Sequence, residues 1–243
     1  MSAPRKLYES DRCTLWLGDC RDVQVERNCC GLMATDPPYG VEWRSRFAKR
    51  RAFGPIAGDD GLLDVPAILG GFTAAILRDR HVYVFGYRPD VISEPMKLGA
   101  TSELIWNKGQ PGLGDLSLPW GPQHEVITFG VYVPSKANRA ANHGVLSARV
   151  RHGSVLSVPR HNSARVTRHP TEKPVALMRQ LIESSSVVGE CVFDPFAGVG
   201  STLVAAILLG RRAVGIEIDE GYANVAVQRV RDAERLASAM EAA

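Results

Sequence analysis

Short apolar runs alternate along the chain with amphipathic stretches in which apolar residues recur every three or four positions. The short runs predict strands and the amphipathic stretches predict helices. The predicted strands are residues 14–17, 31–35, 81–85, 102–106, 125–129, 191–193 and 213–216, and the predicted helices are residues 65–78, 174–185, 201–209 and 221–237. This alternation is typical of an α/β fold with a mainly parallel sheet between helices. At 243 residues, we expect one domain spanning residues 1–243.

Basic residues are concentrated in two loop segments. The chain has a net charge of +3, but residues 41–56 carry +4 and residues 134–173 carry +7, which leaves −8 elsewhere. Residues 41–60, 107–123 and 134–170 are rich in glycine, proline or charge without a clear period, so we expect them to be loops or excursions from the sheet. Two basic segments on an otherwise acidic protein indicate a surface for a polyanion such as nucleic acid. A pair of solvated loops is the alternative.

Several classes of protein are disfavoured by composition. No apolar run approaches the roughly 20 residues of a membrane span, and the start lacks the apolar stretch of a signal peptide, so a cytoplasmic protein is expected. The five cysteines form no CxxC pair, and the six histidines show no metal-binding spacing. We therefore predict neither a disulfide framework nor a metal site.

A glycine-containing turn follows the predicted strand 191–193. It reads Asp194-Pro195-Phe196-Ala197-Gly198-Val199-Gly200 and leads into a predicted helix. Such a turn brings the backbone close to a ligand, as in nucleotide-binding folds. Glu217 ends the next strand, where a carboxylate can accept hydrogen bonds from ribose hydroxyls. An ordinary surface carboxylate is the alternative for Glu217.

A second turn, Asp36-Pro37-Pro38-Tyr39, follows the predicted strand 31–35. Two prolines stiffen the backbone as it leaves the sheet. The Asp36 carboxylate and the Pro37 carbonyl can accept hydrogen bonds from an exocyclic amine, and Tyr39 offers a face on which a base can stack. These are the requirements of a flipped nucleobase. An ordinary Asp-Pro turn is the alternative.

Together these motifs resemble the β-type DNA amino-methyltransferases, which use S-adenosylmethionine (SAM). The resemblance rests on seven blocks in the order of that family. They are residues 17–20 (LGDC), 36–39 (DPPY), 105–108 (IWNK), 124–127 (HEVI), 169–174 (HPTEKP), 194–200 (DPFAGVG) and 215–219 (GIEID). It implies a Rossmann-like, seven-stranded methyltransferase sheet with helices on both faces, circularly permuted and carrying basic loop insertions.

The resemblance also implies an organisation and a set of functional residues. A catalytic half at about residues 12–130 would precede a short DNA-recognition segment at about 131–166 and a cofactor half at about 167–237. The implied catalytic residues are Asp36, Pro37, Pro38 and Tyr39. The implied cofactor-binding residues are Asp19, Cys20, Asp36, Thr171, Lys173, Asp194, Phe196, Gly198, Gly200, Ser201, Thr202, Glu217 and Ile218. The basic residues expected on DNA are Arg44, Arg46, Lys49, Arg50, Arg51, Arg139, Arg149 and Arg151.

The implied reaction is transfer of a methyl group from SAM to the N6 amine of adenine in double-stranded DNA, by base flipping and direct in-line transfer, with S-adenosylhomocysteine as the product. No metal is required, and a homodimer is a further expectation. Asp36 in the first position of its motif favours adenine over the N4 amine of cytosine, which stays open as the alternative. A catalytically silent DNA-binding protein of the same fold is the rival from another class. A nicotinamide-dependent oxidoreductase is disfavoured because Leu203 stands where a third glycine is required.

Overall fold

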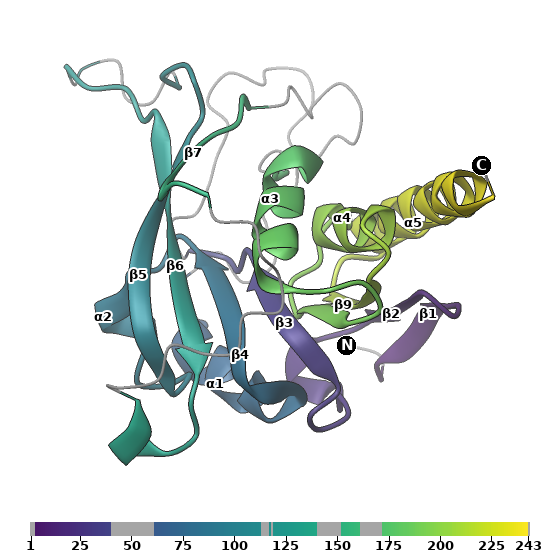
Figure 1. Ribbon diagram of the computed structural model, residues 1–243, viewed down its shortest axis with the longest axis horizontal. Helices are drawn as coiled ribbons and strands as arrows, with labels where there is room; N and C mark the ends of the chain where they lie inside the picture. Colours follow the sequence, from purple (N-terminus) through teal and green to yellow (C-terminus); the bar gives the residue numbers. More distant parts are fainter. Residues whose placement is uncertain are drawn as a thin grey trace.

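One continuous sheet organises the protein. The computed structural model describes residues 3–39, 61–112, 117, 119–139, 152–160 and 172–242. The strands in these residues form one nine-stranded sheet in the order β1-β2-β9-β8-β3-β4-β6-β5-β7 (Figure 1). They are β1 (Arg5–Glu9), β2 (Cys13–Leu17), β3 (Cys30–Thr35), β4 (Ile76–Phe85), β5 (Leu98–Asn107), β6 (His124–Tyr132), β7 (Val155–Ser157), β8 (Cys191–Asp194) and β9 (Arg212–Glu217).

Strand direction determines where the candidate motifs meet. From β2 through β9, β8 and β3 to β4, neighbouring strands are parallel, so their carboxyl ends share one edge of the sheet, called here the carboxyl edge. Strand β6 runs antiparallel to β4 and to β5. The end of β5 and the beginning of β6 therefore lie at the carboxyl edge as well. In open α/β sheets, ligands bind outside this edge.

Helices cover both faces of the sheet. Helices α3 (Val175–Ser185), α4 (Ser201–Leu208) and α5 (Glu220–Glu241) lie together on one face (Figure 1). Helix α1 (Val65–Gly71), the 3-10 helix η2 (Phe72–Ala75) and the short α2 (Pro89–Ile92) lie on the other. Two further 3-10 turns are η1 (Cys20–Asp22) and η3 (Lys136–Asn138).

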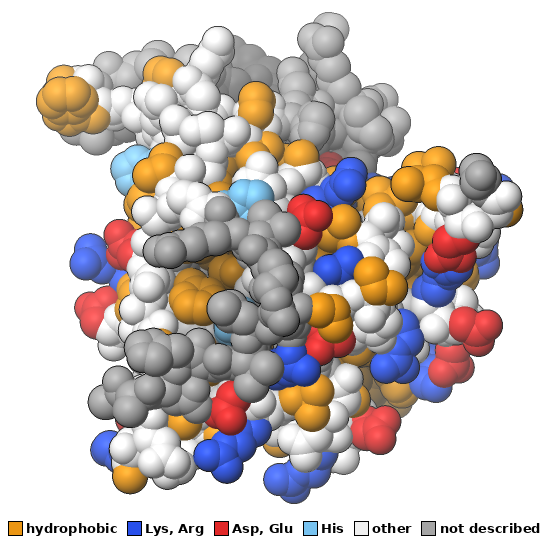
Figure 2. Space-filling model, viewed as in Figure 1, with side chains coloured by type: hydrophobic (Ala, Val, Ile, Leu, Met, Phe, Trp, Pro, Cys, Tyr) orange, Lys and Arg blue, Asp and Glu red, His pale blue; other side chains and the backbone are white. Residues whose placement is uncertain are grey.

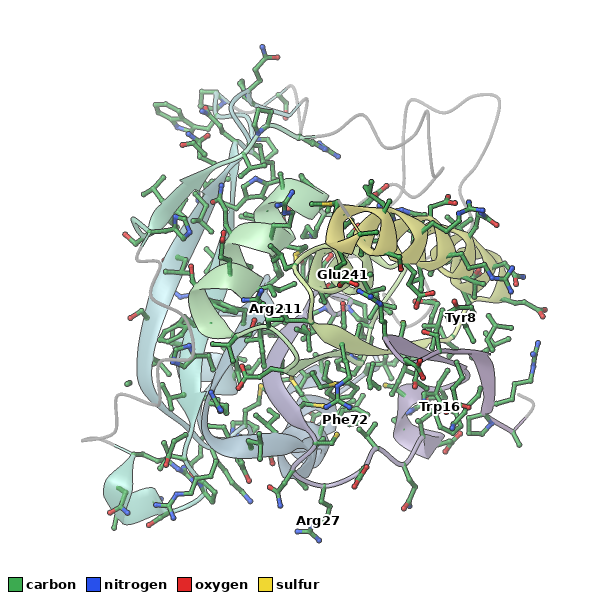
Figure 3. All side chains as sticks on the ribbon, turned by 45° about the vertical axis from the view of Figure 1, so that its right-hand side comes forward. Tyr8, Trp16, Arg27, Phe72, Arg211 and Glu241 are labelled. Carbon is green, nitrogen blue, oxygen red and sulfur yellow. The ribbon has the colours of Figure 1, made fainter. Side chains whose placement is uncertain are left out.

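The apolar alternation of β3 separates two hydrophobic clusters. Leu32 and Ala34 pack in the cluster that contains the apolar sides of α3, α4 and α5. Met33 packs on the opposite face with α1 and η2. On that face the Phe72 ring lies 5.3 Å from the Phe193 ring, centroid to centroid, and Figure 3 shows Phe72 on the side of the strands away from α4 and α5. Both faces of β3 are buried, which fixes the direction in which Asp36 leaves the sheet.

The predicted α/β sheet with helices on both faces is confirmed, and each of the seven predicted strands is present. The predicted number of strands is too low, since the described residues contain nine. Strand β1 is an edge strand with charged residues in its sequence, and β7 has only three residues, so neither carries a strong apolar signal. The chain order implied by the permutation is present, because the C-terminal strands β8 and β9 lie between β2 and β3.

One predicted helix is wrong at its C-terminal end. The expected helix 65–78 ends at Gly71, and after η2 the chain enters β4 at Ile76. Two consecutive glycines, Gly70 and Gly71, favour termination because glycine is a weak helix former. Among the described helices, none is both long and apolar enough to cross a membrane. The single sheet contains strands from both halves of the chain, whereas the extent of the domain over all 243 residues stays a prediction.

Candidate active site at the carboxyl edge

A buried lysine is paired with the carboxylate that follows β3. The Lys173 ammonium donates a hydrogen bond to Asp36 Oδ2 over 2.6 Å, and the Tyr39 hydroxyl donates to Asp36 Oδ1. The Lys173 side chain is 5% exposed, whereas 24% of the Asp36 side chain remains accessible. Burial raises the pKa of Asp36, and the attraction of Lys173 opposes this shift. The Asp36 side chain is therefore held by two donors while part of it remains accessible.

A second carboxylate extends this pair into a network of four charges. Glu125 Oε2, at the start of β6, lies 3.1 Å from Lys173 Nζ, and Glu125 Oε1 lies 2.7 Å from Lys108 Nζ. Burial alone would lower the pKa of Lys173, but the attraction of Asp36 and Glu125 outweighs it and raises that pKa. The two cations and two carboxylates balance, which compensates their burial. We therefore treat Lys173 as protonated.

Aromatic side chains enclose the Lys173 ammonium. It lies 5.6 Å from the ring centroid of Tyr39, 5.2 Å from that of Phe85 and 5.9 Å from that of Trp106. A cation at this range over an aromatic face is stabilised by the ring electrons. These rings come from the turn after β3 and from the ends of β4 and β5, so the network sits where three strands end.

The end of β4 holds the Asp36-Tyr39 turn in place. Gly86 has φ +74°, and a Cβ atom there would lie 2.0 Å from Tyr39 Cε1, so only glycine leaves space for this ring. The Tyr87 hydroxyl donates to the Pro38 carbonyl over 2.9 Å. The Tyr39 and Tyr87 rings meet edge to face at 6.3 Å. Pro37 is buried beneath the turn. The Asp36-Tyr39 turn is therefore a rigid structure rather than a free loop.

The glycine turn adjoins the Asp36-Tyr39 turn through a buried carboxylate. Asp194 Oδ1 accepts hydrogen bonds from the Thr35 hydroxyl at 2.7 Å and from the backbone amide of Phe196 at 3.0 Å. Its Oδ2 accepts from the Thr202 hydroxyl at 2.6 Å. Burial raises the pKa of Asp194 to about 6. Because Thr35 directly precedes Asp36, the Asp194 carboxylate links the two turns. All three of these hydrogen-bond donors belong to the protein itself.

Glu217 lies inside the glycine turn at the end of β9. Its Oε2 accepts from the Gly198 amide at 2.7 Å, and its Oε1 accepts from the Asp219 amide at 2.8 Å. Burial raises the pKa of Glu217 to about 7. Gly200 has φ +81°, and a Cβ atom there would lie 3.0 Å from Ala226 Cβ of α5. This cradle presents backbone amides and a carboxylate close to the start of α4.

The remaining predicted cofactor residues flank that cradle. The Ser201 hydroxyl donates to Glu172 Oε1 at 3.3 Å, and Arg229 pairs with the same oxygen at 2.7 Å. Asp19 follows β2, next to β9, and the Arg21 guanidinium holds the pKa of its carboxyl below the usual range. Cys20 beside it is buried, whereas Ile218 is 36% exposed. The cradle is therefore bordered by Asp19 after β2 and by the accessible apolar side chain of Ile218 after β9.

Some predicted residues lie elsewhere or outside the described residues. Arg139 follows η3 and donates to Glu94 Oε2 at 2.7 Å and to the Val133 carbonyl at 3.2 Å. Since β6 runs antiparallel to β4, Arg139 lies toward the opposite edge of the sheet from Asp36, and the structure does not bring them together. The predicted DNA-binding and cofactor-binding residues that fall outside the described ranges are Arg44, Arg46, Lys49, Arg50, Arg51, Arg149, Arg151 and Thr171.

Sequence reasoning missed part of the site. Glu125 lies in one of the quoted blocks but received no role, and Lys108, Gly86 and Tyr87 received none either. The available signal was positional, because Gly86 and Tyr87 directly follow a predicted strand and Glu125 begins one. Among the described residues, no cluster of three or more His, Cys, Asp or Glu side chains is placed to hold a metal ion.

Comparison with known proteins agrees with this geometry. A family model described as DNA methylase (N6_N4_Mtase) matches residues 94–228, which is more than half of the chain. The chain is 51% identical over 67 residues to "Putative methylase YubD" of Escherichia coli (strain K12), and 45% identical over 62 residues to "DNA adenine methyltransferase YhdJ" of the same organism. These matches cover 28% and 26% of this chain, respectively. They cover 30% and 21% of the two relatives.

Solved structures show the same fold at low sequence identity. The M1.HpyAVI–SAM complex superposes with a TM-score of 0.66 at 18% identity, covering 90% of this chain and 98% of that one. The cytosine-N4-specific PvuII DNA methyltransferase superposes with a TM-score of 0.65 at 12% identity, covering 96% and 94%. The family model spans more than half of the chain, including strands β5 to β9 and the glycine turn, so the chain belongs to the N6/N4 DNA methylase family.

Proposed function

We propose that this protein transfers a methyl group from SAM to the exocyclic amine of a base in double-stranded DNA, with the N6 amine of adenine as acceptor. The observation that carries the proposal is the partly accessible Asp36 carboxylate, fixed by Lys173 and Tyr39 beside the glycine turn. Membership in the DNA methylase family supports the reaction class. The matches to the curated relatives cover less than a third of the length of each relative. The activity of the whole protein is therefore part of this proposal.

The residues at the glycine turn fit SAM. Glu217 offers carboxylate oxygens for the ribose hydroxyls, and Gly198 and Gly200 let the backbone approach a ligand closely. Ile218 offers an apolar contact for the adenine ring, and Asp19 offers an acceptor for its amine. Bound SAM would supply a methyl group on a positively charged sulfur and leave as S-adenosylhomocysteine. Asp194 would act by positioning its neighbours, because its carboxylate oxygens accept hydrogen bonds from Thr35, Thr202 and Phe196.

Asp36 meets the chief demand of the acceptor amine. The amine lone pair is delocalised into the base, so it must be aimed at the methyl carbon. By accepting the amine hydrogens, the Asp36 carboxylate and the Pro37 carbonyl would favour a tetrahedral nitrogen with its lone pair directed outward. The carboxylate also stabilises the positive charge that grows on nitrogen as the new bond forms. One amine proton then leaves the nitrogen, and the Asp36 carboxylate would receive it.

Lys173 and Tyr39 prepare Asp36 for this role. A carboxyl in a largely buried position tends to become protonated, and a protonated group would lose acceptor strength. The Lys173 ammonium, 2.6 Å from Asp36 Oδ2, favours the anion. The Tyr39 ring borders the accessible carboxylate and offers a surface on which an extruded base can stack. The contact of Lys173 with the cofactor, implied by the family resemblance, stays a prediction.

The acceptor base is tested by product analysis. Purified protein is incubated with unmethylated genomic DNA and methyl-labelled SAM, the DNA is digested to nucleosides, and the labelled nucleoside is identified by mass spectrometry. We expect label in N6-methyladenine. Label in N4-methylcytosine would favour the second candidate, for which the fold shared with the PvuII enzyme is the supporting observation. Cofactor binding without label on any DNA would contradict the proposal and favour the silent DNA-binding protein.

The affinity for SAM is expected to depend on pH through Glu217. Its pKa is raised to about 7, so the carboxyl takes up a proton as the pH falls below that value. A protonated carboxyl accepts ribose hydroxyls less well, so affinity should fall between pH 8 and pH 6. Isothermal titration of SAM across this range measures the effect. Glu217→Gln should weaken binding at pH 8 and flatten the pH dependence, and an unchanged slope in this variant would contradict the assignment.

The basic segments are proposed to contact DNA phosphates. Replacing Arg44, Arg46 and Arg50 together by glutamine should weaken DNA binding and reduce the slope of log K against log salt, by about 2 to 3 if each arginine neutralises one phosphate. Fluorescence anisotropy with a labelled duplex at several salt concentrations gives the slope. Arg235→Gln is a useful comparison, since Arg235 is an exposed arginine of α5 that pairs with Asp232 outside both basic segments and should leave the slope unchanged. A slope that does not respond to the triple change would assign these arginines to a solvated loop.

We also propose that residues 131–166 contribute to sequence recognition, that the protein is cytoplasmic, and that it forms a homodimer. Size-exclusion chromatography with light scattering tests the last of these. A monomer at micromolar concentration would contradict it.

A further inference from the structure

The connection between β5 and β6 extends beyond the sheet at the carboxyl edge. We call residues 107–112 and 119–124 the hairpin arm. Figure 1 draws it at the upper left, beyond the ends of β3 and β4. The pairing of the two strands continues into it, from Trp106 opposite Glu125 to Asn107 opposite His124. The hairpin arm is therefore a direct continuation of two sheet strands.

Backbone contacts and prolines stiffen the hairpin arm. The Lys108 amide donates to the Gln123 carbonyl at 2.9 Å, and the Gly112 amide donates to the Pro122 carbonyl at 3.0 Å. The two sides cross closely, because a Cβ atom at Gly121 would lie 2.9 Å from the Gly112 carbonyl oxygen and from Pro111 Cβ. Prolines at 111, 119 and 122 restrict the backbone further. A residue on this arm is held at a defined position relative to the sheet.

The base of the hairpin arm is part of the candidate active site. Trp106 and Glu125 oppose each other in the last register before the arm, and both lie against Lys173. Lys173 in turn contacts Asp36. Trp120 lies five positions before Glu125 in the chain, which allows a reach of at most about 18 Å beyond the network. This is about twice the depth of a DNA major groove, roughly 8.5 Å.

Trp120 is the exposed aromatic residue of the hairpin arm. Its side chain is 84% exposed between two residues that cannot shield it, Pro119 and Gly121. In the space-filling view, hydrophobic side chains protrude at the upper left, where the arm lies (Figure 2). Arg160, also exposed, lies beside the arm: its amide donates to the Lys108 carbonyl at 3.3 Å, and its NH1 comes within 3.9 Å of the Cβ position of Gly112. An indole with a neighbouring guanidinium suits a base together with a phosphate.

We propose that Trp120 stacks on the DNA bases next to the target base and offsets the stacking that is lost when the target is extruded toward Asp36. This inference rests on the proposed function and adds a DNA contact outside both basic segments. Apolar side chains inserted at a base step stabilise distorted duplexes in this way. The stiff arm supports the role, because an aromatic side chain on a fixed support loses little freedom when it stacks.

The test compares two duplexes that differ only in the cost of base extrusion. One contains the methylated sequence, mapped separately on the undigested methylated DNA, with its target base paired. The other places an abasic site opposite the target. Trp120→Ala should lower kcat/KM on the paired duplex about tenfold or more, as expected for loss of a base-aromatic stack. The loss should be much smaller on the second duplex, and Trp120→Phe should retain most of the activity on both.

Val188→Ala is the matched control. Val188 is also exposed, at 73%, but it lies between α3 and β8 at the opposite edge of the sheet. It should behave as the wild type. Equal activity of Trp120→Ala and wild type on the paired duplex would overturn the inference, and so would an equal loss on both duplexes.

Binding without SAM separates this inference from the proposed function. Trp120→Ala should also weaken binding of the paired duplex about tenfold by anisotropy. If the wild-type protein labels no DNA but this difference in binding persists, the proposed function is contradicted and the role of Trp120 is not. The absence of a binding difference would overturn the role of Trp120 in either case.

Discussion

Replacing Asp36 by alanine should reduce methyl transfer to less than a few per cent of wild type while leaving SAM binding nearly intact. The carboxylate is the accessible acceptor at the end of β3, and the amine loses both its aim and its charge stabilisation without it. Removing one preorganised group that stabilises charge in a transition state commonly costs about 100- to 1000-fold in rate. Single-turnover labelling of DNA, with SAM binding measured in parallel by calorimetry, gives both quantities.

The fold should tolerate this change. Lys173 keeps Glu125 as a partner at 3.1 Å when Asp36 is removed, so the buried ammonium is not left alone. Asp90→Ala provides the control, because Asp90 is an exposed carboxylate on α2 whose side chain is 76% accessible. An Asp36→Ala variant that retains normal turnover would exclude the proposed role of this carboxylate. Loss of SAM binding together with turnover would assign Asp36 to the cofactor instead.

Replacing Lys173 by methionine should lower turnover at neutral pH at least about tenfold and shift the acidic limb of the rate profile to higher pH. Burial raises the pKa of Asp36, and the attraction of Lys173 opposes this shift. Without the ammonium, the Asp36 pKa rises further, so the anion forms at higher pH and activity falls at pH 7. A shift of one pKa unit corresponds to about 1.4 kcal/mol between the two protonation states. Single-turnover rates from pH 5.5 to pH 9.5 measure the shift.

Two variants distinguish positioning from simple loss of stability. Lys173→Arg keeps the charge, so it should be more active than Lys173→Met. The acidic limb of its rate profile should lie close to that of the wild type. Lys108→Met removes the other cation of the network, which pairs with Glu125 at 2.7 Å. The acidic limb of its rate profile should therefore shift less than that of Lys173→Met. Thermal melting tests all variants, since an unpaired buried charge costs about 3–5 kcal/mol. A methionine variant that stays folded and active with an unshifted limb would exclude this role for Lys173.

The sequence predicted the two turns well because their information is local. Pro37 and Pro38 end the strand before them, and Gly198 and Gly200 allow a tight turn into α4, so both structures are determined by a few neighbouring residues. Both were also predicted to follow strands. Parallel strands bring their carboxyl ends to one edge, and the Thr35-Asp194 hydrogen bond joins the two turns there.

The charge network around Asp36 could not be predicted in the same way. Lys173 lies 137 positions from Asp36 in the chain, and Glu125 comes from a third segment. Each contact depends on the order of strands in the sheet and on the depth at which the side chain is buried. The family resemblance placed Lys173 near the cofactor, whereas the structure shows its ammonium on the carboxylate of the catalytic turn.

By itself, the sequence determined the α/β class, seven of the strands, the two turns and the family resemblance, because periodicity and proline or glycine positions act over a few residues. The tertiary structure decided which charges meet. It placed β8 and β9 between β2 and β3, brought the start of β6 to the same edge of the sheet as the end of β3, and left Trp120 exposed beyond the site. Such pairings depend on long-range packing and on the balance of buried charges, which no local pattern encodes.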